Sequence, residues 1–210
     1  MTQDDLERGA ARADLCRFLA ACYYQPGPEF AEEKLFDSMF AAAARVGPDF
    51  AARARRLGEA FAAERPENLL VDYTRLFLGP VDTLARPYGS VWLEGQQALM
   101  QDSTMAVQQL YDEGGFEIDD DFRELPDHVA AELEFLYLLI FRETEAAQKD
   151  DRDTLATLSA LRARFLSEHL GAWVGPFAMA VAKGAQTPFY RELAELTRRY
   201  VRVEAGDSPP

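Results

Sequence analysis

Clusters of proline and glycine divide this chain into stretches in which apolar residues recur every three or four positions. The first stretch carries Leu15, Phe18, Leu19 and Cys22, and it ends at the Gln-Pro-Gly-Pro segment 25–28. Spacing of this kind places apolar side chains on one face of an α-helix, and a proline–glycine cluster stops the helix. This pattern restricts most of the chain to helices.

The same spacing recurs along the rest of the sequence, and no alternating run is long enough to predict a sheet. It indicates further helices around 36–43, 50–61, 69–77, 107–111, 125–141, 155–166, 171–182 and 188–203. The predicted fold class is therefore all-α, a single-domain bundle of about nine helices over 1–205. The Gly-Asp-Ser-Pro-Pro end, 206–210, is predicted to be a disordered tail.

Two stretches depart from the ordinary amphipathic pattern. Residues 133–141 are apolar nearly all round, which predicts a place at the centre of the bundle. Residues 81–102, after the fourth helix, show no sustained period and gather proline, glycine and aromatic residues, so a long irregular segment is expected. Long segments of this kind in compact domains are more often functional than decorative.

Charge narrows the possible partners. The 210 residues include 22 basic and 36 acidic side chains, a net charge of −14. Such a field repels phosphate backbones and attracts cationic partners, so no nucleic acid partner is predicted. Acidity that serves only solubility is the alternative.

The apolar runs, the N-terminus and the cysteines indicate where the protein resides and whether its thiols are reduced. The longest uninterrupted apolar runs have seven residues, against about 20 in a membrane-spanning helix, so no membrane segment is predicted. The N-terminus lacks the features of an export signal, and a cytoplasmic location is expected. Cys16 and Cys22 are six residues apart on one helix, too far for a disulfide, and are expected to be reduced core residues.

Enzyme and cofactor signatures find no match. His128 and His169 stand on different predicted helices without paired cysteines, which argues against zinc. The positions three residues before them are Leu125 and Leu166 rather than glutamate, which excludes the usual di-iron bundle site. Neither phosphate-binding glycine motif occurs, and Ser90 lacks the second glycine of a nucleophile elbow. The sequence predicts no catalytic residue, no metal and no cofactor.

Two clusters rise above this background. The first joins 73–80, Tyr-Thr-Arg-Leu-Phe-Leu-Gly-Pro, to 86–94, Arg-Pro-Tyr-Gly-Ser-Val-Trp-Leu-Glu. Aromatic and proline side chains on irregular backbone are typical of an apolar peptide-binding groove. The alternative is that Leu76 and Phe77 belong to the core and Trp92 merely fills the loop.

The second cluster begins at Leu-Pro-Asp-His, 125–128, and continues with Glu132 and Glu134. Asp127 could simply cap a helix start. The other hypothesis is an exposed Asp127–His128 pair that accepts hydrogen bonds from a guanidinium, with Glu132 one turn on adding a carboxylate for the same ligand.

Four motifs in order resemble the TorD/DmsD family of redox-enzyme maturation chaperones, which includes the NarJ branch. They are Tyr73-x-x-Leu76-Phe77-x-Gly79-Pro80, Pro87-Tyr88-Gly89-Ser90-Val91-Trp92-Leu93, Asp102-Ser103-Thr104 and Leu125-Pro126-Asp127-His128-Val129. The stretch 87–104 is most similar to the DmsD-like branch, although Tyr88 stands where those relatives often carry tryptophan.

The resemblance implies a cytoplasmic chaperone that binds the twin-arginine signal peptide and catalytic subunit of a molybdenum-cofactor enzyme of the dimethyl sulfoxide reductase type. It would delay export until the cofactor is inserted, as a monomer or a domain-swapped dimer. By the same resemblance, Asp127 and His128 match the family's signal-peptide-binding pair. Further site residues expected from the motifs, and from charge for Glu132, are Tyr73, Leu76, Phe77, Pro87, Tyr88, Ser90, Trp92 and Glu132.

Two alternatives stand beside this expectation. The nearest is a NarJ-like assembly factor whose client is not exported. The alternative from another class is a helical enzyme that uses Asp127 and His128 as an acid–base pair. A peptide with an arginine pair followed by an apolar segment needs a receptor with carboxylates beside an aromatic groove. The first cluster supplies the groove, and the second supplies the carboxylates.

Overall fold

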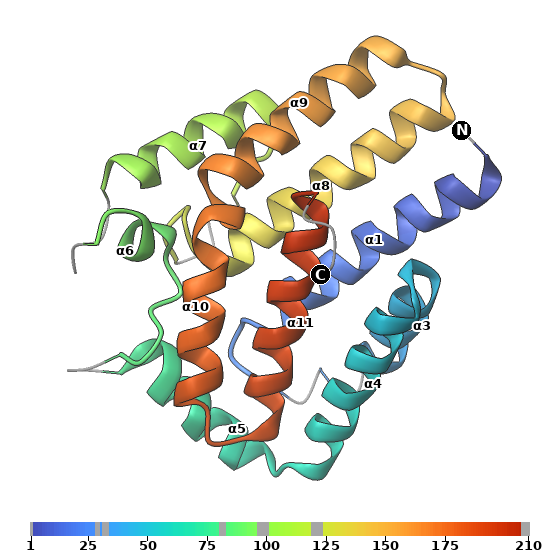
Figure 1. The fold of residues 1–210 in the computed structure, drawn as a ribbon. Helices are drawn as coiled ribbons and strands as arrows, with labels where there is room; N and C mark the ends of the chain where they lie inside the picture. Colours follow the sequence, from blue (N-terminus) through green and yellow to red (C-terminus); the bar gives the residue numbers. More distant parts are fainter. Residues whose placement is uncertain are drawn as a thin grey trace.

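The described part of the chain is a bundle of α-helices (Figure 1). The computed structural model describes residues 2–27, 30, 34–79, 83–95, 101–118 and 124–206. The helices are α1 (Gln3–Ala21), α3 (Leu35–Val46), α4 (Pro48–Ala63), α5 (Pro66–Tyr73), α6 (Gly89–Leu93), α7 (Asp102–Gly114), α8 (Val129–Gln148), α9 (Arg152–Glu168), α10 (Leu170–Gly184) and α11 (Pro188–Glu204). These ranges contain no strand, and the all-α prediction is confirmed.

Helix α8 occupies the centre of the bundle, with α1 packed on one side and α9 on another (Figure 1). Its apolar middle is buried, including Leu133, Leu136 and Leu139, as the sequence predicted. The prediction fails at the end of that run, where Phe141 is 42% exposed. Burial continues beyond it to Ala146, and Tyr137 and Leu138 are only partly buried, so the neighbouring helices cover most of the length of α8 but leave one of its faces exposed.

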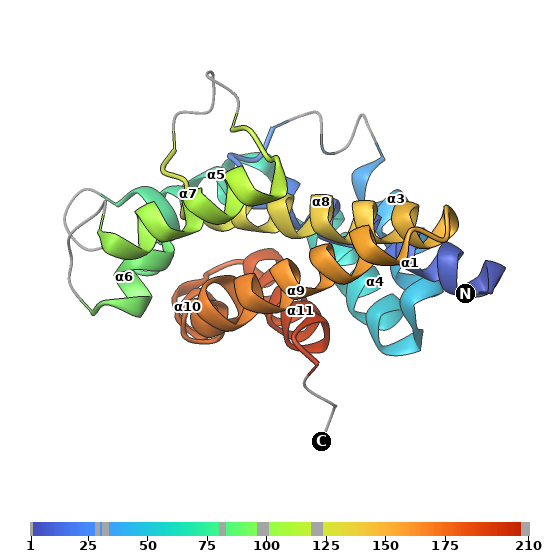
Figure 2. The same cartoon turned by 90° about the horizontal axis from the view of Figure 1, so that it is seen from above.

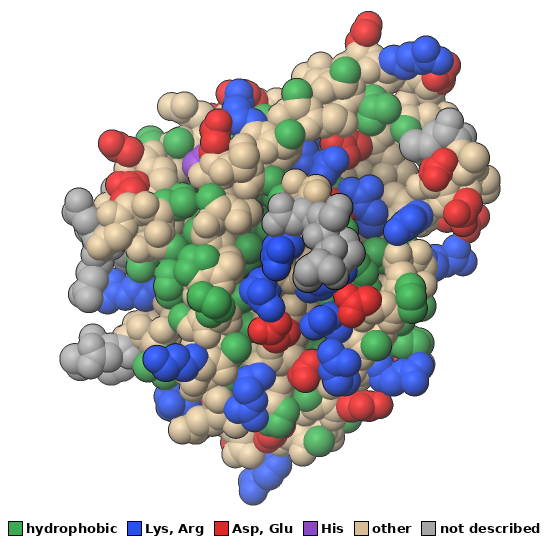
Figure 3. All heavy atoms as spheres, viewed as in Figure 1, with side chains coloured by type: hydrophobic (Ala, Val, Ile, Leu, Met, Phe, Trp, Pro, Cys, Tyr) green, Lys and Arg blue, Asp and Glu red, His purple; other side chains and the backbone are tan. Residues whose placement is uncertain are grey.

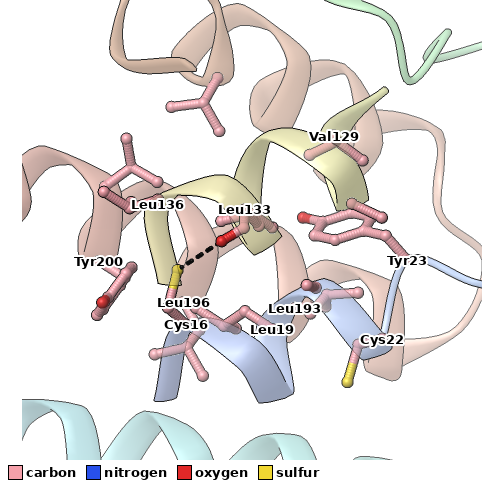
Figure 4. Close-up of a cluster of buried hydrophobic side chains, with 14 of the residues drawn as sticks. Cys16, Leu19, Cys22, Tyr23, Val129, Leu133, Leu136, Leu193, Leu196 and Tyr200 are labelled. Atoms are coloured by element: carbon pink, nitrogen blue, oxygen red, sulfur yellow. Dashed lines mark hydrogen bonds between the residues drawn. The ribbon is translucent and has the colours of Figure 1, made fainter. Parts of the chain in front are cut away.

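The cysteines lie in the core between α1, α8 and α11 (Figure 4). Cys16 and Cys22 are both free and fully buried, which confirms their expected role as core residues. The Cys16 thiol donates a hydrogen bond to the Leu133 carbonyl oxygen at 3.2 Å, which ties α1 to α8. Burial raises the pKa of both thiols, so each stays protonated and unreactive.

Helix α8 begins later than the sequence predicted, at Val129 rather than near Leu125. His128 is its N-cap in extended conformation, and the ring Nδ1 accepts a hydrogen bond from the Ala130 N–H at 3.2 Å. The backbone before it is held elsewhere, because the Asp127 carbonyl accepts from Gly89 N–H at 2.8 Å. That competing pairing stops the helix from extending toward its N-terminus.

The segment 81–102 is less irregular than expected, since it contains the five-residue helix α6. The fourth predicted helix is likewise split into α5 and a π-helical turn, η1 (Thr74–Leu78). The Leu76 carbonyl accepts a hydrogen bond from Ala85 N–H at 2.9 Å, which ties η1 to the segment that leads into α6. Both short elements escape a period-based prediction because they span little more than one turn.

Buried Asp72 anchors α5 to the start of α11. Its carboxylate accepts hydrogen bonds from the backbone N–H groups of Gln186 and Thr187 and from the Thr187 hydroxyl, at 2.8–3.2 Å. Arg75 lies 3.0 Å from the same carboxylate. This anchor fixes the orientation of Tyr73, the next residue along the chain.

The described residues 22–27, which follow α1, lie on the same side of the bundle as the described ends of the connection between α7 and α8, residues 115–118 and 124–128, away from α10 and α11 (Figure 2). Within the described ranges, no helix has the length and apolarity required to span a membrane. The aspartates 119–121 and the residues 207–210 of the predicted tail lie outside the described residues.

Candidate functional site

Backbone pairing joins the two sequence clusters into one structural unit. Tyr88 and His128 form an isolated antiparallel bridge, in which Gly89 N–H donates to the Asp127 carbonyl and Val129 N–H donates to the Pro87 carbonyl, both at 2.8 Å. Segments almost 40 residues apart in sequence are thereby fixed side by side. The second and fourth motifs therefore describe one site.

The third motif closes the same unit from α7. Ser103 donates from both its backbone N–H and its hydroxyl to the Glu94 carboxylate, at 2.9 and 2.6 Å. Glu94 directly follows α6, and the Gln101 side-chain amide donates to the Ser90 carbonyl at 3.2 Å. Together with the Leu76–Ala85 hydrogen bond, these contacts gather all four motifs around α6.

Asp127 is buried, with 1% of its surface exposed, so its predicted exposure is wrong. Its Oδ2 accepts a hydrogen bond from Ser90 N–H at 2.8 Å, which caps the first turn of α6. It therefore does cap a helix start, but that of α6 rather than of α8. The other carboxylate oxygen, Oδ1, has no hydrogen-bond partner among the described residues, and neither has the buried Ser90 hydroxyl.

His128 is also buried, at 3% exposure, which corrects the second half of the predicted pair. Its ring packs edge-on against Tyr88, with centroids 5.5 Å apart. Burial lowers the pKa of His128 to about 4, so the imidazole is neutral near pH 7. Since Nδ1 caps α8 and Asp127 does not bond the ring, the two side chains lack the geometry of a catalytic acid–base pair.

Glu132 does not provide the predicted exposed carboxylate, because it is fully buried beneath α6. Its Oε2 accepts from the Trp173 indole N–H at 2.9 Å, and burial raises its pKa well above the usual range. A Cβ on Gly89 would lie 2.9 Å from that indole nitrogen and 3.0 Å from Glu132 Oε1. Only glycine fits there. We call Gly89, Ser90, Asp127, His128 and Glu132 the motif layer.

The apolar residues of the first motif shape the site from beneath. Leu76 and Phe77 are buried in the core, as the alternative to a groove-lining role predicted. Trp92 is half-buried and donates its indole N–H to the Arg86 carbonyl at 2.8 Å, so it holds the loop before α6. Pro87 is buried and takes part in the bridge through its carbonyl. Binding roles for these residues stay predictions.

Partly exposed polar groups adjoin the motif layer through Tyr88, which contacts His128. Tyr88 is half-buried, and its hydroxyl donates to Glu124 Oε2 at 2.5 Å. Tyr24, just beyond the end of α1, donates to Glu134 Oε1 on α8 at 2.7 Å. Each tyrosine thus holds one partly exposed carboxylate in place, and neither carboxylate is drawn into the core.

These pairs and Tyr73 form one electrostatic group. Burial, followed by the charge of Glu124, raises the pKa of Tyr73 to about 12. Burial, a hydrogen bond to a carboxylate and the charge of that carboxylate raise the pKa of Tyr88, next to Glu124, and of Tyr24, next to Glu134. Partial burial also raises the pKa of Glu134. We call Tyr24, Tyr73, Tyr88, Glu124 and Glu134 the tyrosine–glutamate cluster.

The face formed by α4 and α11 differs from this acidic cluster, because it carries many Lys and Arg side chains (Figure 3). There the arginines meet acids, as in Arg56–Glu192 at 3.1 Å and Arg199–Asp49 at 3.0 Å. Within the described residues, Glu124 and Glu134 take part in no salt bridge. The described residues thus place no salt-bridge partner at the two carboxylates of the tyrosine–glutamate cluster.

This arrangement is suited to binding a cation. A carboxylate oriented by one hydrogen bond keeps further acceptor sites, which a guanidinium can fill with paired N–H donors. Tyrosine ring faces add cation–π attraction. Among the described side chains, no group of three or more His, Cys, Asp or Glu is arranged to hold a metal ion.

The sequence analysis missed Tyr24 and Glu124, and it gave Glu134 less weight than Glu132. The sequence does contain features that distinguish Glu134 and Glu124. Glu132 stands three residues after Val129 and so shares the buried face of α8, whereas Glu134 falls off that face. Glu124 directly precedes the Leu125–His128 motif. Tyr24 follows the end of α1, 110 residues before its partner Glu134, and no local pattern marks it.

Comparison with known proteins places these residues in context. The model of the family described as "Nitrate reductase delta subunit" matches residues 44–179, a range that includes all four motifs, Glu124 and Glu134. Tyr24 lies outside the matched range.

Individual relatives agree with this match. The Tat proofreading chaperone DmsD of Salmonella typhi is 31% identical over 138 residues, which cover 66% of this chain and 61% of that protein. The match thus spans about three fifths of the relative's length. The chaperone protein TorD of Shewanella loihica is 26% identical over 179 residues, which cover 83% of this chain and 78% of that protein.

A solved structure supports the fold. A protein of Archaeoglobus fulgidus, described as a redox enzyme maturation protein, superposes with a TM-score of 0.54 at 22% sequence identity. The superposition covers 91% of this chain and 93% of the other. At that identity, the likeness establishes the shared helical fold alone.

Proposed function

This chain belongs to the nitrate reductase delta subunit family, and from that premise we propose that it is a chaperone for the maturation of a redox enzyme. It binds the twin-arginine signal peptide of a molybdenum-cofactor oxidoreductase of the dimethyl sulfoxide reductase type. Binding takes place in the cytoplasm and delays export until the catalytic subunit has received its cofactor and folded. The names of the DmsD and TorD relatives support a chaperone rather than an enzyme.

The observation that carries this proposal is the pair of tyrosine-held carboxylates: Glu124 is bonded to Tyr88 of the second motif, and Glu134 is bonded to Tyr24. A twin-arginine peptide brings two guanidinium groups close together, and each can bind one carboxylate through charge-assisted hydrogen bonds. The net charge of −14 attracts the basic peptide over a longer range. We therefore propose that Glu124 and Glu134 make the direct contacts.

The motif layer has a positioning role in this proposal. Asp127 holds α6, and His128 holds the start of α8 while its ring packs against Tyr88. Since both side chains are buried, they act by fixing Tyr88 and its bonded Glu124 rather than by meeting the peptide first. Tyr73, Leu76, Phe77 and Trp92 support the same surface from below.

Isothermal titration with the signal peptide of the molybdoenzyme encoded beside this gene tests the proposal. One control peptide carries alanine at both arginine positions, and a second carries lysine. We expect micromolar or tighter binding that the alanine peptide loses and the lysine peptide retains only weakly, because lysine cannot form the bidentate contact. Binding should also weaken as salt rises. Equal binding of all three peptides would refute the proposal.

A second candidate, an assembly factor for an enzyme subunit that is not exported, is favoured by the description of the matched family. In that case the ligand is a basic segment without an intact arginine pair. Retained binding of the double-alanine peptide, or of the folded client subunit alone, would favour this function over the first.

A further inference from the structure

Helix α10 carries an apolar face that the other described elements leave uncovered. From Leu170 to Ala182 the helix has no charged side chain. Ala172 and Pro176 are exposed, and Met179 is 61% exposed, more than any other large apolar side chain among the described residues. Their spacing of four and three residues places them on one side of the helix. Figure 3 shows hydrophobic side chains gathered over α10.

The opposite face of α10 belongs to the core. Trp173, Phe177 and Val181 are fully buried, so the helix is apolar on both faces. A helix that is apolar all round is typical of a buried position, and an exposed apolar face usually marks an interaction site. Leu84, 44% exposed, extends the face, because its side chain lies beside Gly184 at the end of α10. The outer face of α10 is therefore suited to a partner.

The residues at the two ends of this face have opposite charges. Glu168, the last residue of α9, is exposed just before α10 begins, and Lys183 is exposed near the end of α10. In sequence the two are equally distant from the point between Gly175 and Pro176. Two copies of α10 that cross at this point in antiparallel orientation bring each Lys183 toward the Glu168 of the other copy.

The side-chain sizes match in the same arrangement. Met179 and Ala172 are also equally distant from the crossing point, so the protruding Met179 of each copy meets the small Ala172 of the other. Gly175, at the crossing point, has no side chain to hold the two helices apart. A face that complements itself in both charge and size meets the requirement for a two-fold symmetric contact.

We propose that the α10 face binds the α10 face of a second copy of this chain in a two-fold symmetric dimer. The net charge of −14 favours this face, because two acidic copies repel each other wherever they present like charges. One helix of 15 residues is about 22 Å long, too short to bury the roughly 800 Å² per partner of a stable interface, so the dimer is weak and reversible. Salt screens the repulsion between the copies and should strengthen the dimer, whereas it weakens peptide binding.

This inference goes beyond the proposed function, since the dimer forms without a peptide. Residues 22–27 and 124–128, which include Tyr24 and Glu124, lie on the side of the bundle away from α10 (Figure 2). Each copy in the dimer therefore keeps an accessible tyrosine–glutamate cluster. A variant that loses the dimer should keep its affinity for the peptide.

Two exposed methionines provide a matched test. Met179 lies on the α10 face, and Met105, 54% exposed, lies on another helix, α7. Met179→Glu and Met105→Glu add the same charge at similarly exposed positions. Sedimentation equilibrium at several protein concentrations gives the dimer dissociation constant, and circular dichroism establishes that each variant is folded. We expect Met179→Glu to weaken the dimer at least about tenfold and Met105→Glu to change it by less than about twofold.

Two results of this experiment would overturn the proposal. One is a wild-type protein that stays monomeric at every concentration. The other is equal dimerisation of the folded Met179→Glu and Met105→Glu variants, which would place the contact elsewhere, as an exchange of helices between copies would.

A charge exchange tests the antiparallel pairing itself. Lys183→Glu and Glu168→Lys should each weaken the dimer, because both end contacts then join like charges. In an equimolar mixture of the two variants, both end contacts of the mixed dimer join opposite charges again. The mixture should therefore dimerise nearly as well as the wild type. A mixture that dimerises no better than its two components would contradict the pairing.

Discussion

The motif layer and the tyrosine–glutamate cluster meet where Tyr88 packs against His128, yet they differ in burial and in what holds their carboxylates. The motif layer is buried, and its bonded groups pair with backbone N–H or with indole N–H. In the tyrosine–glutamate cluster Tyr73 is buried and the other four residues are half-buried, and among the described residues its carboxylates are held by tyrosine hydroxyls alone. Residues that define the family's pattern here build the scaffold, while accessible charge comes from residues beside the motifs.

Four substitutions test this difference between the two regions, and they are given in order of their expected effect on stability. The largest concerns His128, whose pKa is lowered by burial to about 4 from 6.5. Between these values the unfolded chain binds a proton at His128 that the folded chain does not. The stability that the neutral His128 contributes is therefore complete above about pH 6.5 and is lost as the pH falls to about 4. It amounts to at most about 3 kcal/mol.

His128→Asn tests this, because asparagine caps a helix well but does not titrate. Urea denaturation of wild type and variant across this pH range gives the free energy of unfolding of each. The difference between the two proteins should shrink, or change sign in favour of the variant, as the pH falls. Parallel profiles would show that His128 is not the group responsible.

The next effect is steric and also lies in the motif layer. In Gly89→Ala the new methyl group meets the Trp173 indole and Glu132, which should cost about 1–3 kcal/mol of stability. Gly47→Ala is the control, because a Cβ there meets no atom within 4 Å outside its chain neighbours and the backbone at Gly47 is extended. That change should alter the stability of the protein by less than about 1 kcal/mol. Thermal unfolding distinguishes the two, and equal shifts would contradict the described packing.

Asp127→Ala should have a smaller effect, about 1–2 kcal/mol, through loss of the cap on α6. Asp151→Ala is matched to it, since Asp151 caps α9 by a hydrogen bond from Thr154 N–H at 3.1 Å. Both variants should lose stability, measured by urea denaturation. Only Asp127→Ala should weaken peptide binding, because only that cap supports the site. Equal affinities in the two folded variants would remove Asp127 from the site altogether.

Much of the fold could be predicted from the sequence because helices of three or more turns leave a repeated apolar pattern. The middle of α8 is the clearest case. The elements that place the site are shorter or depend on distant partners: α6 is five residues long, and Asp127 holds it across a separation of 37 residues. Pattern alone marked Asp127 and His128 but could not show whether they face solvent, because their burial depends on the bridge to Tyr88.

The site was predicted less well for the same reason. Glu132 and Glu134 stand two residues apart, yet one meets Trp173 in the core and the other meets Tyr24 at the surface. Both partners are remote in sequence. Helical geometry gave a usable hint for Glu132, whereas the accessibility of Glu124 and Glu134 required the folded chain.

The most direct test of the account is the affinity of the twin-arginine peptide for Glu124→Gln/Glu134→Gln. Glutamine still accepts the tyrosine hydrogen bonds, so stability should change by less than about 0.5 kcal/mol. Glu145→Gln/Glu168→Gln is the control, because it removes the same charge elsewhere on α8 and α9. We expect about 100-fold weaker binding in the first double variant and nearly wild-type binding in the second. Equal affinities would contradict the claim that these carboxylates bind the arginine pair.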